Sequence, residues 1–200
     1  MISRLFGQNK EQDFWTWFQK NKDDYYHFEN NQETLFDKLN ARLNGIHGDL
    51  TFEFSPIHED GTRELFISAD GIKAAFDSVI SLVDKAPEIP GWKIIAFRQR
   101  IPGDDMSINI SGLKIGYSDI YFRHGEEDGK IIIELNIRAF DPKDNRFKNA
   151  IYILLDGLIG EYDMETIIGG IDWVNLDGSK IDSLTPLVEL RDIVDEFKAR

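Results

Sequence analysis

The sequence predicts an α+β fold: a mainly antiparallel sheet covered by helices, with an N-terminal helical hairpin and a C-terminal helix. Three observations predict it. Apolar residues recur at helical spacing in the first third of the chain and again near its end. Between them, short stretches alternate apolar and polar residues and are joined by turn dipeptides such as Asp60-Gly61 and Asp128-Gly129. The regular alternation of strands and helices that is typical of doubly wound nucleotide-binding folds is absent.

Two amphipathic helices are expected in the first third of the chain. The first has an aromatic side, formed by Phe14, Trp15, Trp17, Phe18, Tyr25 and Phe28. The second has an apolar stripe, formed by Leu35, Phe36, Leu39 and Leu43, and Asn44-Gly45 follows as a helix end. Aromatic residues at helical spacing usually belong to a core, so we expect this hairpin to pack on the sheet. The alternative is that the rings dock a partner or a second copy of the chain.

Strand patterns dominate the middle of the chain. We expect strands at 50–54 and 65–67, and then a helix that Asp70 caps and that Pro87 and Pro90 end. A longer strand at 92–101 follows this helix. Further strands are expected at 108–110, 113–115, 120–122 and, after the hairpin turn at Asp128-Gly129, at 131–140.

The last third contains a helix after Asp141-Pro142, a short strand at 171–174 and an amphipathic helix at 186–198. No Ser- or Pro-rich linker divides the chain, and no repeat is present. We therefore expect residues 1–200 to form a single domain, with residues 1–10 disordered.

Composition excludes several classes of partner. The chain carries 23 Lys and Arg against 36 Asp and Glu, a net charge of −13, which repels nucleic-acid phosphates and anionic lipids. We therefore expect neither nucleic acid nor membrane as a partner. The absence of cysteine excludes disulfides and thiolate metal sites and suits a reducing compartment. With no signal-like start and no apolar run long enough to span a bilayer, a cytoplasmic protein is expected.

Sequence motifs for common chemistry are missing. There is no phosphate-binding loop, no dinucleotide fingerprint and no nucleophile elbow. The four histidines, His27, His47, His58 and His124, are far apart and form no His-x-x-x-His pair. We therefore expect no cofactor and no metal site, and we assign no catalytic residue.

Arg98 and Arg100 are the first candidate ligand-binding residues. If the strand at 92–101 is regular, its pleat puts both arginines on the face of Trp92, Ile94 and Ala96. Two guanidinium groups beside an apolar wall can hold a carboxylate or a phosphate. The alternative is that both arginines leave the sheet edge and pair with nearby acids.

Asp156 and Glu161 are the second pair of candidates. Asp156 projects about 150° from the centre of the apolar stripe of its helix, away from the core. Glu161 shares a face with Glu165 if the helix continues past Gly160. Carboxylates converging there can bind a hard cation or act as an acid–base pair. A solvated helix end with local caps explains the same residues without a ligand.

The strand at 131–140 has two different faces. Its apolar face consists of Ile131, Ile133, Leu135 and Ile137, and its polar face includes Glu134, Asn136 and Arg138. The polar face is therefore either open to solvent or the floor of a shallow cleft.

Four stretches resemble an uncharacterised bacterial protein family, a domain of unknown function. They are FWxWF at 14–18, ISADGI at 67–72, WKIIAFRxR at 92–100 and LLDxxxGEYD at 154–163. The similarity spans most of residues 12–175 and implies a shared fold and a bacterial origin. The resemblance implies no particular activity for this chain, so no catalytic residue is assigned from it.

From these observations we expect a soluble, non-enzymatic binding or protein-interaction domain, such as an accessory to another bacterial system. It would act as a monomer or homodimer, on a protein partner or a small molecule. The alternative is an enzyme or small-molecule binder that recognises an anionic ligand through a cleft formed by Arg98, Arg100, Asp156 and Glu161. A cavity that brings these side chains together would favour this alternative.

Overall fold

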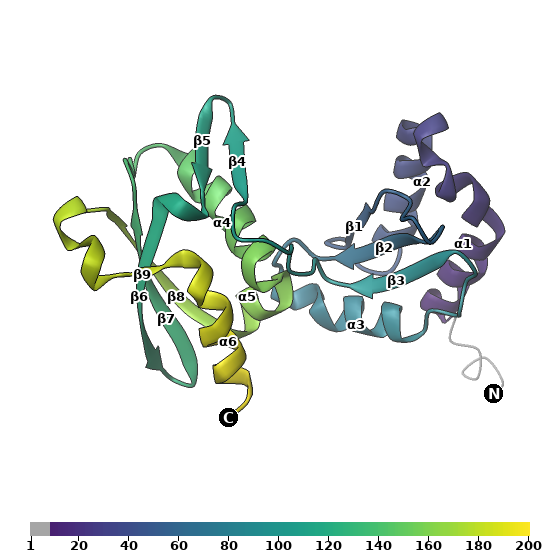
Figure 1. Ribbon diagram of the computed structural model, residues 1–200. Helices are drawn as coiled ribbons and strands as arrows, with labels where there is room; N and C mark the ends of the chain where they lie inside the picture. Colours follow the sequence, from purple (N-terminus) through teal and green to yellow (C-terminus); the bar gives the residue numbers. More distant parts are fainter. Residues whose placement is uncertain (1–8) are drawn as a thin grey trace. The chain divides into compact units, whose positions relative to one another are not determined.

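The computed structural model describes residues 9–200 and confirms the α+β class (Figure 1). The chain divides into two compact units, Met1–Arg98 and Gln99–Arg200, and each has its own hydrophobic core. The expected disorder of residues 1–10 falls mostly on residues 1–8, outside the described part, whereas Lys10 already begins a helix. The single-domain organisation stays a prediction.

The described part of the first unit, residues 9–98, combines three α-helices with a three-stranded sheet. Its elements are α1 (Lys10–Tyr26), α2 (Gln32–Asn44), β1 (Thr51–Phe54), β2 (Arg63–Ser68), α3 (Phe76–Asp84) and β3 (Trp92–Ala96). The strand order is β1-β2-β3, and β1 pairs with β2 in antiparallel fashion, as expected for a hairpin. β3 pairs with β2 in parallel, because the chain returns through α3.

The aromatic side of α1 belongs to the core of this unit. Trp15 is 2% exposed, and its indole Nε1 donates to the carbonyl oxygen of Leu82 in α3 at 2.8 Å. Phe18 is fully buried and meets Trp92 of β3 edge to face, with ring centroids 5.2 Å apart. The prediction that these rings pack on the sheet is therefore confirmed.

The strand expected at 92–101 is shorter than predicted, because Phe97 interrupts it. β3 ends at Ala96, and Phe97 has a φ of 62°, in the left-handed region, which breaks the alternation of side chains between the two faces. The buried Phe97 ring packs on Phe76, with centroids 4.6 Å apart. The prediction that one sheet face carries Arg98 and Arg100 is therefore wrong.

Asp70 is also placed differently from the prediction. Asp70 and Gly71 have φ values of 48° and 77° and form a turn, and a 3₁₀ turn at Lys73–Ala75 then precedes α3. The residue that caps α3 is Ala75. Asp70 is therefore not a helix cap, and its carboxylate instead accepts a hydrogen bond from Arg98.

The second unit contains a hairpin and a four-stranded mixed sheet. Its elements are β4 (Ser107–Ile110), β5 (Leu113–Gly116), β6 (Ile120–Glu127), β7 (Lys130–Ile137), α4 (Asn145–Ile159), α5 (Glu161–Ile167), β8 (Ile168–Asn175), β9 (Thr185–Pro186) and α6 (Leu190–Lys198). β4 and β5 form the hairpin, and the sheet has the order β8-β7-β6-β9. β7 and β8 are parallel, and both other pairs in this sheet are antiparallel.

The sheet of the second unit has one buried face and one exposed face. The buried face carries Ile131, Ile133, Leu135 and Ile137, which lie in one core with Leu154 of α4 and Val194 of α6. Glu134 and Ile132 alternate with these residues and are only partly buried. The predicted apolar face is confirmed, whereas the predicted polar face is confirmed only at Glu134, because Asn136 is buried and β7 ends before Arg138.

Both units share one order of connections, which the sequence did not predict. In each, a hairpin is followed by a helical crossover and a parallel strand: β1, β2, α3 and β3 in the first, and β6, β7, α4, α5 and β8 in the second. A strand that pairs in parallel needs such a crossover. Within residues 9–200, no helix is both long and apolar enough to span a bilayer.

Candidate functional site

Arg98 is held by acids of the first unit. Its Nη1 contacts the carboxylate of Asp70 and lies 3.6 Å from Oε1 of Glu53. With both acids beside it, the Arg98 side chain is still 25% exposed to solvent. Neither acid was predicted to pair with Arg98, because both lie on other segments that only the folded sheet brings close to it.

Arg100 forms a network inside the second unit. Its Nε donates to the carbonyl oxygen of Ile159 at 3.0 Å, and its two Nη atoms donate to Asp195 at 2.9 Å and Asp163 at 3.3 Å. Hydrogen bonding to Arg100 lowers the pKa of Asp195. Asp163 is only 8% exposed and also accepts from Nζ of Lys198 at 2.7 Å. The network thereby joins α5 to α6.

Asp156 and Glu161 lie on either side of a helix break. α4 ends at Ile159, and Gly160, with a φ of 85°, separates it from α5, so the two helices are not continuous. Glu161 is the first residue of α5 and is completely buried, whereas Asp156 and Glu165 are partly exposed. Glu161 and Glu165 therefore lie in the same short helix, but only the side chain of Glu165 is exposed to solvent in part.

The four candidates are divided between the units. Arg98 belongs to the first unit, and Arg100, Asp156 and Glu161 belong to the second. Both arginines donate to carboxylates of their own unit, which favours their interpretation as partners of nearby acids. A ligand-binding role for the four residues stays a prediction.

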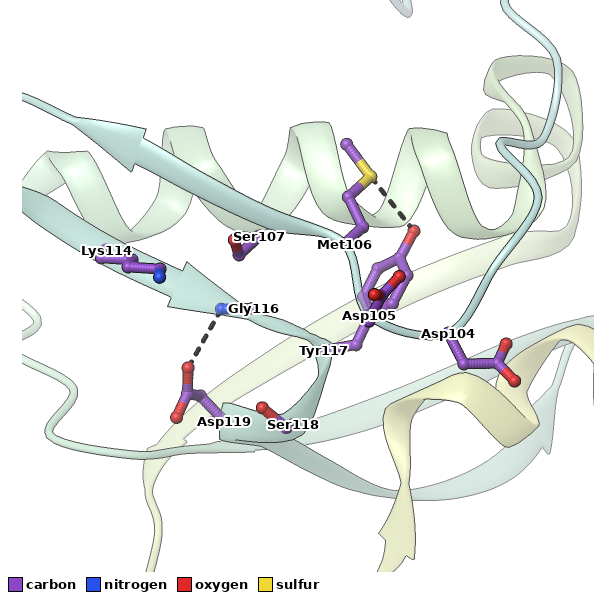
Figure 2. A pocket seen from close by; sticks show the side chains of 9 residues that line it. All are labelled: Asp104, Asp105, Met106, Ser107, Lys114, Gly116, Tyr117, Ser118 and Asp119. Carbon is purple, nitrogen blue, oxygen red and sulfur yellow. Dashed lines mark hydrogen bonds between the residues drawn. The ribbon is translucent and has the colours of Figure 1, made fainter.

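A first hollow of about 450 Å³ lies beside the β4–β5 hairpin (Figure 2). The phenol of Tyr117 donates to the sulfur of Met106 at 3.4 Å, and burial raises the pKa of Tyr117. Asp105 lies in front of the Tyr117 ring, and Lys114 lies at the far end of the hollow.

The other two carboxylates of this hollow already have protein partners. Asp104 pairs with Nη1 of Arg191 at 2.5 Å. Asp119 accepts the backbone N–H of Gly116 at 3.0 Å, drawn in Figure 2, and lies 3.3 Å from Nε of Arg138. The Asp119 contacts stabilise the turn from β5 to β6, and the Asp104 contact joins the segment before β4 to α6, so both acids have structural roles.

A second hollow lies on the exposed face of the four-stranded sheet, and we call it the glycine groove. The strand register places Gly125 of β6, Ile132 of β7 and Gly170 of β8 in one row across the sheet. The volume of the groove is about 440 Å³. Because both neighbours of Ile132 in this row lack side chains, its apolar side chain forms the floor of the groove.

The free space above Gly125 and above Gly170 differs, which explains why the groove is open on the β6 side. A methyl group added to Gly125 would meet no atom within 4 Å, whereas one added to Gly170 would lie 3.4 Å from Cδ1 of Ile132. The Ile132 side chain therefore leans toward β8, and the free space lies above Gly125. Of this strand only Ile132 and Glu134 line the open hollow, so Glu134 is the one residue of the predicted polar face that lies beside it.

The next row of the sheet gives the glycine groove its charge. Arg123, Glu134 and Asp172 are paired across the three strands. Glu127 projects from this face too, so three carboxylates and one guanidinium group surround the groove, whereas Glu126 and His124 pair with Ile131 and Ile133 of the buried face. Sequence analysis identified Glu134 on this face but missed Gly125, Ile132 and Gly170, because the strand register decides which residues share a row.

No protein-family model, curated protein or solved structure matches this chain. The resemblance to an uncharacterised bacterial family therefore stays a prediction. Among residues 9–200, no group of three or more His, Asp or Glu side chains is arranged to hold a metal ion.

Proposed function

We propose that the protein is a binding domain that docks another protein in the glycine groove. The observation that carries this proposal is the row Gly125–Ile132–Gly170, which leaves an apolar floor partly exposed on the sheet face near the β6–β7 turn. A hollow with an apolar floor and a charged rim has the general composition of a protein-binding surface. We further propose that the protein acts in the bacterial cytoplasm, which its lack of cysteine and the family resemblance support.

The groove can be filled without disturbing the fold, which gives a direct test. Gly125→Leu places a side chain in the open space, where an added Cβ meets no atom within 4 Å. Gly178→Leu is the matched control, because an added Cβ there also meets nothing within 4 Å and Gly178 does not line the groove. Both variants should keep the thermal midpoint of the wild type, which checks that they fold.

A random peptide library displayed on phage supplies the probe. Clones selected on the wild-type protein should bind the Gly178→Leu variant equally and lose binding to the Gly125→Leu variant. Clones that bind all three proteins alike, or a selection that enriches no clone, would contradict the proposal.

A further inference from the structure

We propose that the glycine groove receives an extended, basic segment of the partner protein, added as a strand to the free edge of β6. One large apolar side chain of this segment would lie over Gly125 and contact Ile132. This inference rests on the proposed function and adds the conformation and chemistry of the partner.

The edge of β6 beside the groove is open. β9 pairs only with Tyr121 and Phe122, so in the part of the chain that the structure describes, residues 123–127 have a neighbouring strand on the β7 side alone. The backbone groups on an open edge are a template for a further strand. Peptide segments commonly bind proteins by this strand addition, in which main-chain hydrogen bonds provide affinity and pockets for alternate side chains provide specificity.

The pocket for such a side chain is already present. A strand added to β6 would lie about 4.8 Å from it, and its alternate side chains would point to the exposed face. Opposite Gly125, such a side chain meets no competing group from β6 and can reach across to Ile132. A large apolar residue fills this space and removes the Ile132 side chain from water. A small or polar residue would leave that side chain in contact with solvent.

Charge around the groove selects a basic segment. Three carboxylates, Glu127, Glu134 and Asp172, project from its face against one arginine, and that arginine, Arg123, donates to Oγ of Ser183 at 3.3 Å. Glu134 accepts a hydrogen bond from Nδ2 of Asn136 at 3.0 Å, whereas Glu127 and Asp172 take part in no ion pair among residues 9–200. A lysine or arginine two residues from the apolar residue, opposite Glu127, would complement these acids, whereas a cation on the other side would lie opposite Arg123. A second copy of this chain, with its net charge of −13, would bring like charges together.

Short peptides provide the test. In an extended Lys-Val-Leu-Val-Ser peptide with blocked ends, added antiparallel to β6 with its leucine opposite Gly125, the lysine lies opposite Glu127 and no cation lies opposite Arg123. The controls are Glu-Val-Leu-Val-Ser, Lys-Val-Ser-Val-Ser and a form of the first peptide with N-methylated valines. NMR titration of the full chain should show amide shifts at 123–127 and methyl shifts at Ile132 with the first peptide. Each control should bind roughly tenfold more weakly or worse.

Variants of the protein separate the inference from the proposed function. Gly125→Leu should abolish binding of the basic peptide, Gly178→Leu should not, and Asp172→Lys should weaken the preference for the basic over the acidic peptide. If basic and acidic peptides bind equally and both are lost in Gly125→Leu, the charge inference is wrong but the groove still binds. If the N-methylated peptide binds as well as its parent, strand addition is wrong. Binding that survives Gly125→Leu would overturn both the inference and the proposed function.

Discussion

Arg63 and Glu29 form an ion pair in which the cation is buried and the anion is exposed. The Arg63 side chain is 2% exposed and that of Glu29 is 56% exposed. The guanidinium group also donates to the carbonyl oxygen of Ser55 at 2.9 Å and to that of Tyr26 at 2.5 Å, and it lies over the Phe28 ring. This single side chain therefore joins β2 to the end of α1 and to the segment that leads to α2.

Replacing Arg63 by methionine should destabilise the protein strongly. The substitution keeps an apolar chain of similar length but leaves two backbone carbonyl groups without their donor, at a cost of about 2–4 kcal/mol in the free energy of unfolding. Urea denaturation monitored by tryptophan fluorescence measures this loss. Arg123→Met is the control, since Arg123 is exposed and should change stability by less than about 0.5 kcal/mol. Equal losses in both variants would contradict the structural role given to Arg63.

Stability should depend on pH through Glu29. Hydrogen bonding from Arg63 lowers the pKa of Glu29 in the folded protein. A lowered folded pKa contributes stability above the unfolded value of about 4.3, and this contribution is lost as pH falls through the folded pKa. The wild type should therefore be more stable than Glu29→Gln at neutral pH, and the difference should shrink below about pH 4.3. A pH-independent difference in urea midpoints would show that the charge of Glu29 is not responsible.

Tyr25 should produce a loss of stability at high pH. Burial raises the pKa of Tyr25 to about 12, and its hydroxyl donates to the carbonyl oxygen of Leu35 at 3.0 Å. Because the folded state holds the proton more tightly, the stability from this group is complete below about pH 10, the unfolded value, and is lost as pH rises toward 12. Tyr25→Phe should remove this step from a plot of unfolding free energy against pH. Tyr152→Phe, at a side chain that is 45% exposed, should leave the step in place.

Neighbouring glycines in β8 should differ sharply in their tolerance of alanine. A Cβ on Gly169 would lie 2.6 Å from Cβ of Lys130 and 3.0 Å from Cδ1 of Ile132, whereas a Cβ on Gly170 would have its nearest contact at 3.4 Å. Gly169→Ala should therefore cost about 1–3 kcal/mol, because β7 and β8 must move apart. Gly170→Ala should be close to neutral. Thermal unfolding compares the two variants, and similar midpoints would show that the strands are not held at this spacing.

The sequence predicted the helices and hairpins well because their signals are local. The aromatic spacing from Phe14 to Phe18 identified both a helix and its buried side, and Asp128-Gly129 identified the turn between β6 and β7. Local patterns failed at Phe97, because an apolar residue inside an apolar run gives no sign of a left-handed backbone. They also failed for the parallel pairing of β3 and β8, which depends on where the crossover helices pack.

The candidate site was harder to predict than the fold. Charged residues such as Arg98 and Arg100 attract notice in a sequence, yet the structure gives them carboxylate partners from distant segments. Gly125 and Gly170 attract no notice, since a glycine in a strand is usually explained by a bend or a bulge. Their importance arises from the register that places both beside Ile132.

The division at Arg98 and Gln99 has a consequence for the order of events during translation. All elements of the first unit, from α1 to β3, precede all elements of the second in the chain. A nascent chain can therefore complete the first core before most of the second unit has been synthesised, and domains generally fold in this N-to-C order. In the second unit, β6 and β7 are synthesised before α4 and β8. Their apolar face therefore stays exposed until α4 has been synthesised and packs on it. A chain stalled after β7 would expose that face, and its fate would depend on chaperones.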